Sequence, residues 1–334
     1  MSQLLKNGIR NVLGACALAV AIGALAAEPS ASMKPEAGTF KVGVEPWLGY
    51  GQIHVAAAHG LFKKAGLSGV DVINFSEDKD INAALASGQI DGATIATHTA
   101  MGMVAAGLPV KIVMLLDQSI TADAIIAAPE IKSIADLKGK EVAFEEGTTS
   151  DILLHSALAK AGMAWSDIKP VPMPAANAGS ALIAGRVPVA VTYEPYLSAA
   201  RQQNPKVNML FSGKDDPGVI SDVLVVREEV LEQRPGQVMA MIKAWDAALA
   251  HYNSNNKADR AVIAKAVGAS PEELESAFDG VQFYSLADNQ AQLTGSFSSE
   301  TFPHILKSAS AAGLVPVPVD AAKMIDARFV KALK

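Results

Sequence analysis

A long segment of this sequence occurs twice, and that repeat limits the possible folds more than any other feature. A short apolar strand that begins at Lys41 leads through a loop into a helix that closes at Gly66. The same order recurs from Lys140 to Gly162, at offsets of 99 and 96 residues. The glycines mark the helix ends, where this residue is common. Solenoid repeats span about 20 to 50 residues, so the period is too long for a solenoid.

Each copy continues with a second matching segment. Residues 84–93 end a helix and start a strand, and residues 181–190 repeat this pattern at an offset of 97 residues. Alternation of strand, helix and strand is typical of a parallel sheet with helices on its faces. The two copies therefore predict a two-lobed α/β fold, each lobe a mostly parallel sheet flanked by helices. The alternative is a single doubly wound domain with a helical appendage, and the repeat argues against it.

Two unbroken apolar runs, residues 124–128 and 223–226, follow the two copies and suit buried strands. We interpret them as two strands that cross between the lobes and form a hinge. Residues 38–124 and 227–334 would then form the first lobe, and residues 125–226 the second. Helices expected near residues 234–252, 257–267 and 271–278 would return to the first lobe.

Residues 1–27 have the pattern of a cleaved secretory signal peptide. Lys6 and Arg10 precede an apolar run over residues 12–25, and small residues close it. The alternative is lipidation at Cys16, but here the apolar run follows the cysteine, whereas a lipoprotein signal places it before. No second long apolar stretch follows, so we expect a soluble periplasmic protein that does not span the membrane. Cleavage removes the only cysteine, so we expect no disulfide.

The charge balance and the histidines narrow the possible partners. The chain has 28 basic and 34 acidic residues, a net charge of -6. Residues 1–26 contain two basic residues and no acidic one, so their removal leaves 26 basic and 34 acidic residues and a net charge of -8. Nucleic-acid affinity depends on neutralising phosphates, so we expect no nucleic-acid partner. The six histidines lack the paired spacing of a zinc helix. We therefore expect no metal and no cofactor.

A resemblance to a known family lies in five segments, which are, in order along the chain, residues 41–44, 60–66, 85–92, 134–140 and 326–330. With these segments the chain is similar to the nitrate, sulfonate, taurine and bicarbonate branch of the periplasmic solute-binding proteins of ABC transporters, over nearly the whole mature sequence. This resemblance implies a type II periplasmic-binding fold, a monomer, a small-molecule ligand, and an ABC permease with its ATPase as partner.

Two subgroups of that branch are most similar. Residues 220–227 resemble the taurine-binding proteins, in which an acid at the position of Asp222 faces the ligand amine. Residues 117–123 and 217–222 resemble binding proteins for guanidine-like or urea-related cations. Taurine binders lack the acids that this chain has at Glu146 and Glu194, which is a departure from a sulfonate site.

Ligands of open α/β sheets bind beyond the carboxyl ends of the strands, which locates the candidate site. That rule selects residues 45–51, 97–99, 145–150 and 192–196, together with acids next to the crossings. The candidate ligand-binding residues are Glu45, Trp47, Tyr50, His98, Asp117, Glu146, Thr148, Thr149, Tyr193, Glu194 and Asp222.

Acids and aromatic residues dominate this set. Several carboxylates in one cleft repel one another and resist desolvation unless a cation or bound protons compensate. Aromatic rings attract a cationic group, and more strongly when water is excluded. The alternative is that these acids are solvated and the rings only pack.

The start of the helix after residue 147 favours a second kind of contact. Thr148 and Thr149 stand where unpaired backbone N–H groups and hydroxyls suit a sulfonate or a carboxylate. The same residues also suit a helix cap. A zwitterion would use both the acids and this helix start.

We expect a binding protein and not an enzyme. The enzymes known on the related folds form pyrimidines or tetrapyrroles and depend on cysteines, which the mature chain lacks. The predicted ligands are, in order, an amine or guanidinium compound, taurine or another sulfonate, and a pyrimidine precursor of thiamine or nitrate. A sensor that serves a receptor instead of a permease is the other functional alternative.

Overall fold

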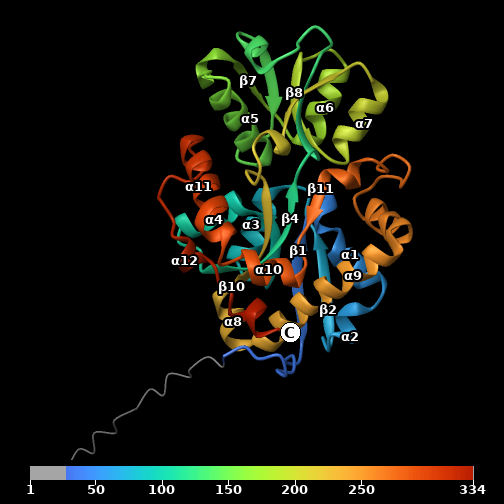
Figure 1. The fold of residues 1–334 in the computed structure, drawn as a ribbon, viewed down its shortest axis with the longest axis vertical. Coiled ribbons are helices and arrows are strands. Elements are labelled where there is room, and N and C mark those ends of the chain that lie inside the picture. Colours follow the sequence, from blue (N-terminus) through green and yellow to red (C-terminus); the bar gives the residue numbers. More distant parts are fainter. Residues whose placement is uncertain (1–27, 334) are drawn as a thin grey trace, which may run out of the picture.

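The computed structural model describes residues 28–333 and arranges them around two β-sheets (Figure 1). The expected signal peptide therefore lies outside the described residues. The six-stranded sheet has the order β11-β4-β10-β3-β1-β2, and the five-stranded sheet has the order β7-β6-β8-β5-β9. The strands are β1 Thr39–Val44, β2 Gly69–Asn74, β3 Gly92–Ala96, β4 Val110–Ser119, β5 Asp123–Ala127, β6 Glu141–Phe144, β7 Lys169–Pro172, β8 Val189–Tyr193, β9 Asn208–Ser212, β10 Ser221–Arg227 and β11 Val281–Phe283.

Each sheet contains one copy of the sequence repeat as a parallel trio of strands. In the larger sheet β1 pairs in parallel with β2 and β3, and in the smaller sheet β6 pairs in parallel with β7 and β8. Antiparallel strands extend both trios: β10, β4 and β11 in one sheet, and β5 and β9 in the other. The two lobes are confirmed, but their sheets are mixed where the sequence predicted mostly parallel ones.

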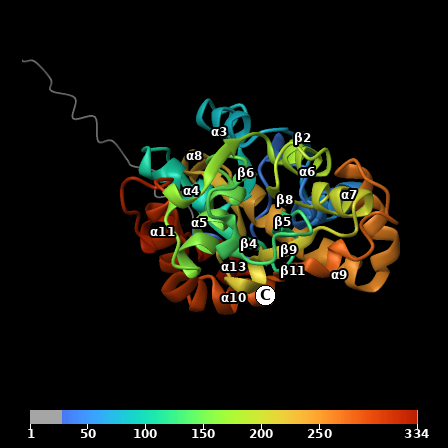
Figure 2. The same cartoon turned by 90° about the horizontal axis from the view of Figure 1, so that it is seen from above.

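The helices divide between the two sheets. Figure 1 shows α5, α6 and α7 around the five-stranded sheet and the other labelled helices around the six-stranded sheet. Viewed from above, α4 and α11 lie on the opposite side of the molecule from α9 (Figure 2). The helices are α1 Gly51–Ala58, α2 Leu61–Lys64, α3 Asp78–Ala86, α4 Thr97–Ala105, α5 Thr149–Lys160, α6 Ala175–Ile183, α7 Tyr196–Gln203, α8 Glu228–Gln233, α9 Pro235–Ala266, α10 Leu286–Gln292, α11 Phe302–Ala311, α12 Ala321–Met324 and α13 Arg328–Ala332.

The chain passes between the sheets twice, between β4 and β5 and between β9 and β10. The apolar runs expected to cross are β5 and β10, which begin directly after the crossings. β10 lies in the six-stranded sheet between β4 and β3, so residues 221–226 pair within the sheet of the first lobe and not of the second. Val223–Val226 are each 1% exposed or less, as expected for a central strand covered on both faces.

The C-terminal helices also differ from expectation in part. The helices predicted at 234–252 and 257–267 form one element, α9, whose helical geometry breaks at Asn255. The helix predicted at 271–278 was wrong, because residues 271–276 form turns before a short 3₁₀ helix, Ala277–Gly280. The carbonyl of Glu275 accepts a hydrogen bond from the Arg260 guanidinium at 3.2 Å.

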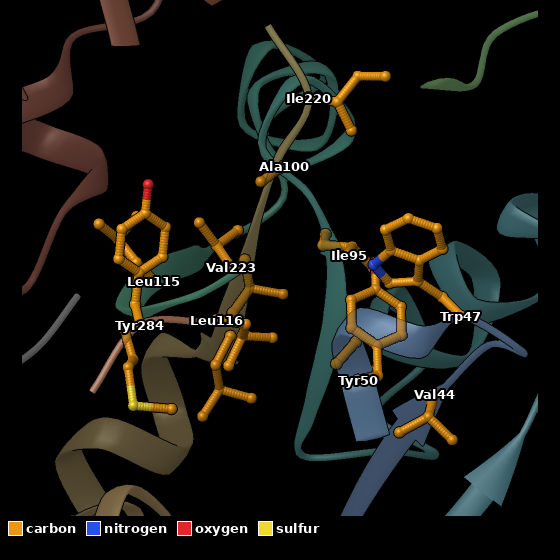
Figure 3. Close-up of a cluster of buried hydrophobic side chains, with 14 of the residues drawn as sticks. Val44, Trp47, Tyr50, Ile95, Ala100, Leu115, Leu116, Ile220, Val223 and Tyr284 are labelled. Atoms are coloured by element: carbon orange, nitrogen blue, oxygen red, sulfur yellow. The ribbon is translucent and has the colours of Figure 1, made fainter. Parts of the chain in front are cut away.

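Buried side chains of the six-stranded sheet support the loops at its edge. Val223 on β10 and Leu115 and Leu116 on β4 belong to one cluster with Trp47 and Tyr50 from the loop after β1 (Figure 3). Within residues 28–333, no helix has both the length and the apolar character to cross a membrane.

Candidate functional site

A cavity lies where loops from the two sheets meet. Its empty volume is about 510 Å³, open solvent at its mouth included. One wall comes from the loops after β1 and β2, the end of β3 and the start of β10, and the other from the loop after β6, the end of β8 and the start of β5. The lining residues are Glu45, Trp47, Tyr50, Ser76, Glu77, Ala96, Asp123, Glu145, Thr148, Thr149, Tyr193, Ile220 and Asp222.

The cavity therefore lies at the carboxyl ends of equivalent strands in the two copies of the repeat. β1 and β6 are counterparts, and each leads into a loop that supplies a carboxylate, Glu45 or Glu145, to the lining. This is the position that the strand-end rule predicts. A ligand here would contact both lobes at once.

Two buried carboxyl groups lie next to each other at the base of the cavity. Asp117 on β4 pairs in register with Asp222 on β10, and their side chains are hydrogen-bonded. Trp47 Nε1 donates to Asp117 Oδ1 at 3.1 Å. Burial raises the pKa of Asp117 to about 7, although the bonds to Trp47 and Asp222 lower it. Asp222 lines the cavity, and Asp117 lies behind it.

The loop after β1 packs closely on this pair. A Cβ atom added to Gly49 would lie 2.2 Å from the carboxyl carbon and both oxygens of Asp117. Only glycine therefore lets the loop approach the carboxyl group and keep Trp47 within hydrogen-bonding distance of it. The loop is thus held to the sheet by polar contacts as well as by packing.

Asp123, the first residue of β5, is a lining acid that sequence reasoning missed. Its carboxyl group is hydrogen-bonded by the side chains of Ser119 and Thr149. Burial raises its pKa to about 7, and the charge of Glu194 adds to the increase. The sequence signal was present, since Asp123 ends the 117–123 segment that resembles cation-binding relatives.

Aromatic rings form a second part of the lining. Trp47 and Tyr193 meet edge to face with centroids 6.0 Å apart, and Tyr193 meets Tyr196 in the same way at 5.4 Å. Burial raises the pKa of Tyr196, and Glu145 and Glu45 raise it further. The rings and these carboxylates therefore occupy the same part of the cleft.

Glu145 takes the place that was predicted for Glu146. Glu145 lines the cavity, and its Oε2 accepts a hydrogen bond from the Ala175 N–H at 2.9 Å, at the start of α6. Glu146 is exposed and does not contribute to the lining. A one-residue step reverses the direction of a side chain in extended backbone, which accounts for the difference.

Glu194 is buried but acts within its own lobe. Its two carboxylate oxygens accept bonds from the backbone N–H and the hydroxyl of Ser198, each at 2.9 Å, in the first turn of α7. Burial raises its pKa. Glu194 is thus a helix-capping residue beside Tyr193 and lies outside the lining.

His98 also lies outside this cavity. It lines a separate depression with Gly147 and Leu314, and it is 2% exposed. Burial lowers the pKa of His98 to about 4, against the effect of hydrogen bonds to the backbone of Gly147 and Thr148. The neutral imidazole therefore supports the loop that begins α5.

The start of α5 is largely satisfied by the protein itself. The Thr148 hydroxyl donates to the carbonyl of Glu145 at 3.1 Å and accepts from the Ser150 N–H at 3.3 Å. The Gly147 N–H donates to Asp151 Oδ2 at 2.9 Å. Thr149 bonds to Asp123. The carboxylates of Asp151 and Asp123 thus already lie at the helix start, where an anionic ligand was expected to bind.

The described lining contains carboxyl groups but no lysine, arginine or histidine. Its acids are Glu45, Glu77, Asp123, Glu145 and Asp222. Glu77 forms an ion pair with the exposed Lys79 at 2.5 Å. Burying several acids in one cavity is costly unless hydrogen bonds, protons or a cation offset their charge.

Comparisons with known proteins give the family. The family model described as NMT1/THI5 like matches residues 49–257. The Escherichia coli protein named "Putative aliphatic sulfonates-binding protein" is 30% identical over 228 residues, which cover 67% of this chain and 71% of that protein.

Solved structures show the same fold. The periplasmic aliphatic sulphonate binding protein from Escherichia coli has a TM-score of 0.74 at 24% identity, with 87% of this chain and 98% of that chain covered. The periplasmic nitrate-binding protein from Synechocystis PCC 6803 has a TM-score of 0.63 at 19% identity, with 89% and 93% covered.

Proposed function

The chain belongs to the NMT1/THI5-like family, with periplasmic solute-binding proteins of ABC transporters among its relatives, and on this premise we propose that its ligand is a small organic cation. The ligand would be an amine or a guanidinium compound, held between the two lobes and delivered to a membrane permease. This assignment departs from the anions named for the sulfonate- and nitrate-binding relatives.

The observation that carries the proposal is the combination of acids and rings in one cavity. Asp222, Asp123 and Glu145 supply carboxyl oxygens, while Trp47 and Tyr193 supply aromatic surface. A cationic group would compensate the buried negative charge and would also interact favourably with the ring faces. A planar guanidinium could donate hydrogen bonds to two carboxylates, because its five N–H donors form a fixed fork.

An anionic ligand fits the same cavity poorly. A sulfonate or nitrate would meet five acids and no cationic side chain in the described lining. The helix start at Thr148 and Thr149, which was the expected anion contact, is already bonded to the protein's own groups. A zwitterion such as taurine would place its sulfonate near Asp151 and Asp123, where like charges repel.

The mechanism follows from the origin of the two walls. Glu45 and Trp47 come from the six-stranded sheet, whereas Glu145 and Tyr193 come from the five-stranded sheet. A ligand that contacts both walls favours the arrangement in which the lobes are close together, because it binds that state better. The two crossings, residues 120–122 and 213–220, are the segments about which the lobes would move.

The proposal includes export and a membrane partner. Residues 1–27 would direct the chain to the periplasm, where it would present the closed, ligand-bound form to an ABC permease and its ATPase. The protein would perform no catalysis, in keeping with relatives that are solute-binding proteins.

Calorimetric titration of the purified protein tests the ligand class. We expect binding of guanidinium, methylguanidine or small alkylamines, with heats that disappear when these are replaced by taurine, alkyl sulfonates or nitrate. Binding of sulfonates or nitrate in preference to every cation would overturn the cation assignment and leave the solute-binding role standing. Transport would be tested by cation uptake in cells with and without the gene, since a receptor-linked sensor would not alter uptake.

A further inference from the structure

Three side chains outside the cavity form a compact cluster that suits a metal ion. His59 follows the last residue of α1, and His251 and Asp259 belong to α9. His59 Nε2 lies 2.8 Å from Asp259 Oδ1, and His251 Nδ1 lies 2.6 Å from Asp259 Oδ2. The three candidate ligand atoms all lie within 4.8 Å of one another.

A break in α9 makes the cluster possible. On a straight helix, residues eight positions apart are separated by about 12 Å along the axis. Asn255, midway between His251 and Asp259, has the non-helical angles φ -136° and ψ 34°. The break turns the second half of α9 so that the Asp259 carboxylate reaches the imidazole of His251.

The environment of Asp259 is unusual for an acid. Its side chain is fully buried, and its ion pairs within residues 28–333 are with the two histidines, not with a lysine or arginine. Each oxygen faces a different imidazole, so the carboxylate holds two ring nitrogens close to it. The two rings are tilted by 32° to each other, with centroids 4.0 Å apart.

The histidines leave the cluster accessible. The side chains of His59 and His251 are 33% and 32% exposed. An ion and a water molecule could therefore approach from the solvent side, while the buried carboxylate anchors the inner side. Two imidazoles, one carboxylate and an open position make up a ligand set that zinc prefers.

We propose that His59, His251 and Asp259 bind one zinc ion, which links the end of α1 to the second half of α9. Ligand atoms of a tetrahedral zinc site are about 3.3 Å apart at bond lengths near 2.0 Å. The imidazole nitrogens lie 2.8 and 2.6 Å from the Asp259 oxygens, so they would have to withdraw by about 0.5 to 0.7 Å. Zinc binds the unprotonated nitrogen of an imidazole, so each ring would carry its proton on the nitrogen that faces away from the ion.

The site is separate from the ligand cavity, so its occupancy has its own consequence. α1 starts at Gly51, directly after the cavity loop that contains Trp47 and Tyr50. Zinc would stabilise the packing of α1 against α9 by binding the folded state. It would act whether or not a ligand occupies the cleft.

Titration calorimetry with ZnCl₂ on protein without a histidine tag tests this inference. We expect one zinc per chain and no comparable binding of MgCl₂, since magnesium prefers oxygen ligands. His59→Gln and His251→Gln should each weaken zinc binding about tenfold or more. His304→Gln is the matched control. His304 pairs with Asp216 at 3.1 Å, a carboxylate that it shares with Lys160 and not with a second histidine, so this variant should leave zinc affinity unchanged.

Cobalt(II) gives a second, spectroscopic readout. A tetrahedral site should produce visible absorption bands that added zinc removes, and these should persist in Asp222→Asn, which alters only the cavity. The inference is overturned if zinc binds the wild-type protein no better than magnesium does. It is equally overturned if both His59→Gln and His251→Gln keep the zinc affinity of the wild type.

Discussion

Asp117 and Asp222 face each other on the antiparallel strands β4 and β10, and their carboxyl groups are joined by a hydrogen bond. Two carboxyl groups can share such a bond only if one of them carries a proton. Asp117 is inaccessible to solvent, whereas Asp222 contributes to the cavity wall. The protonation of this buried pair therefore affects the charge that a ligand in the cavity meets.

Asp222 is the acid whose loss should most affect ligand binding. Asp222→Asn keeps the size of the side chain but removes its charge, and it should weaken binding of the cationic ligand by about 2 kcal/mol or more, or roughly 30-fold. Calorimetry measures the change. Glu146→Gln is the matched control, since it removes one exposed acid outside the lining and should leave affinity unaltered. Equal affinities for the two variants would remove Asp222 from the site.

The ligand-free protein should lose stability as the pH rises from about 4 to about 7. Burial in the fold raises the pKa of Asp117 to about 7 from its ordinary value of 3.8. Between these values the folded state holds a proton that the unfolded state has released, so raising the pH favours unfolding. Urea unfolding at several pH values should show this decline, and Asp117→Asn should flatten it. An unchanged slope in that variant would contradict the role of Asp117.

Affinity for the cationic ligand should depend on pH in the opposite direction. Asp123 lines the cavity, and its pKa is raised to about 7. A cation favours the ionised carboxylate, so binding should strengthen as the pH rises from about 5 to about 8 and release protons. Calorimetry in buffers of different ionisation enthalpy counts those protons. Asp123→Asn should reduce the count, while a count that stays the same would assign the proton elsewhere.

The location of the site was predictable because it depends on the order of strands. The repeat indicated which strands are equivalent, and Glu45 and Trp47 follow one of them directly. Most aromatic and threonine positions were found in the same way. Whether they bind the ligand stays a prediction, since the structure establishes only that they line the cavity.

The roles of the other acids and of the histidine cluster depend on backbone direction and long-range contacts, which the local sequence pattern does not show. Glu145 and Glu146 are adjacent acids, and only the backbone direction before Gly147, which has a φ of +83°, decides which one faces the cavity. Glu194 serves a helix start because Ser198 lies one turn further on. The histidine cluster was missed because Asp259 lies 200 positions after His59, so that no spacing in the sequence links them.

Two variants of Tyr193 separate the contribution of its ring to ligand affinity from that of its hydroxyl. Its ring meets Trp47 edge to face and lines the cavity. Tyr193→Phe should keep most of the affinity for a cation, whereas Tyr193→Leu should lose about 1 to 2 kcal/mol, or roughly 5- to 30-fold. Binding titrations of both variants give the comparison. If the leucine variant binds as well as the phenylalanine variant, the ring face does not contact the ligand.

Gly49 determines how closely the cavity loop approaches the buried acid pair. In Gly49→Ala the new Cβ would meet the Asp117 carboxyl group at 2.2 Å, so the loop or the carboxyl must move and the Trp47 hydrogen bond is strained. We expect a loss of about 1 to 3 kcal/mol in the free energy of unfolding, together with weaker ligand binding. Asp117→Ala in the same chain removes the colliding atoms. A double-mutant cycle should therefore show the alanine at position 49 costing much less in that background, while strictly additive effects would mean that the loop is limited by another contact.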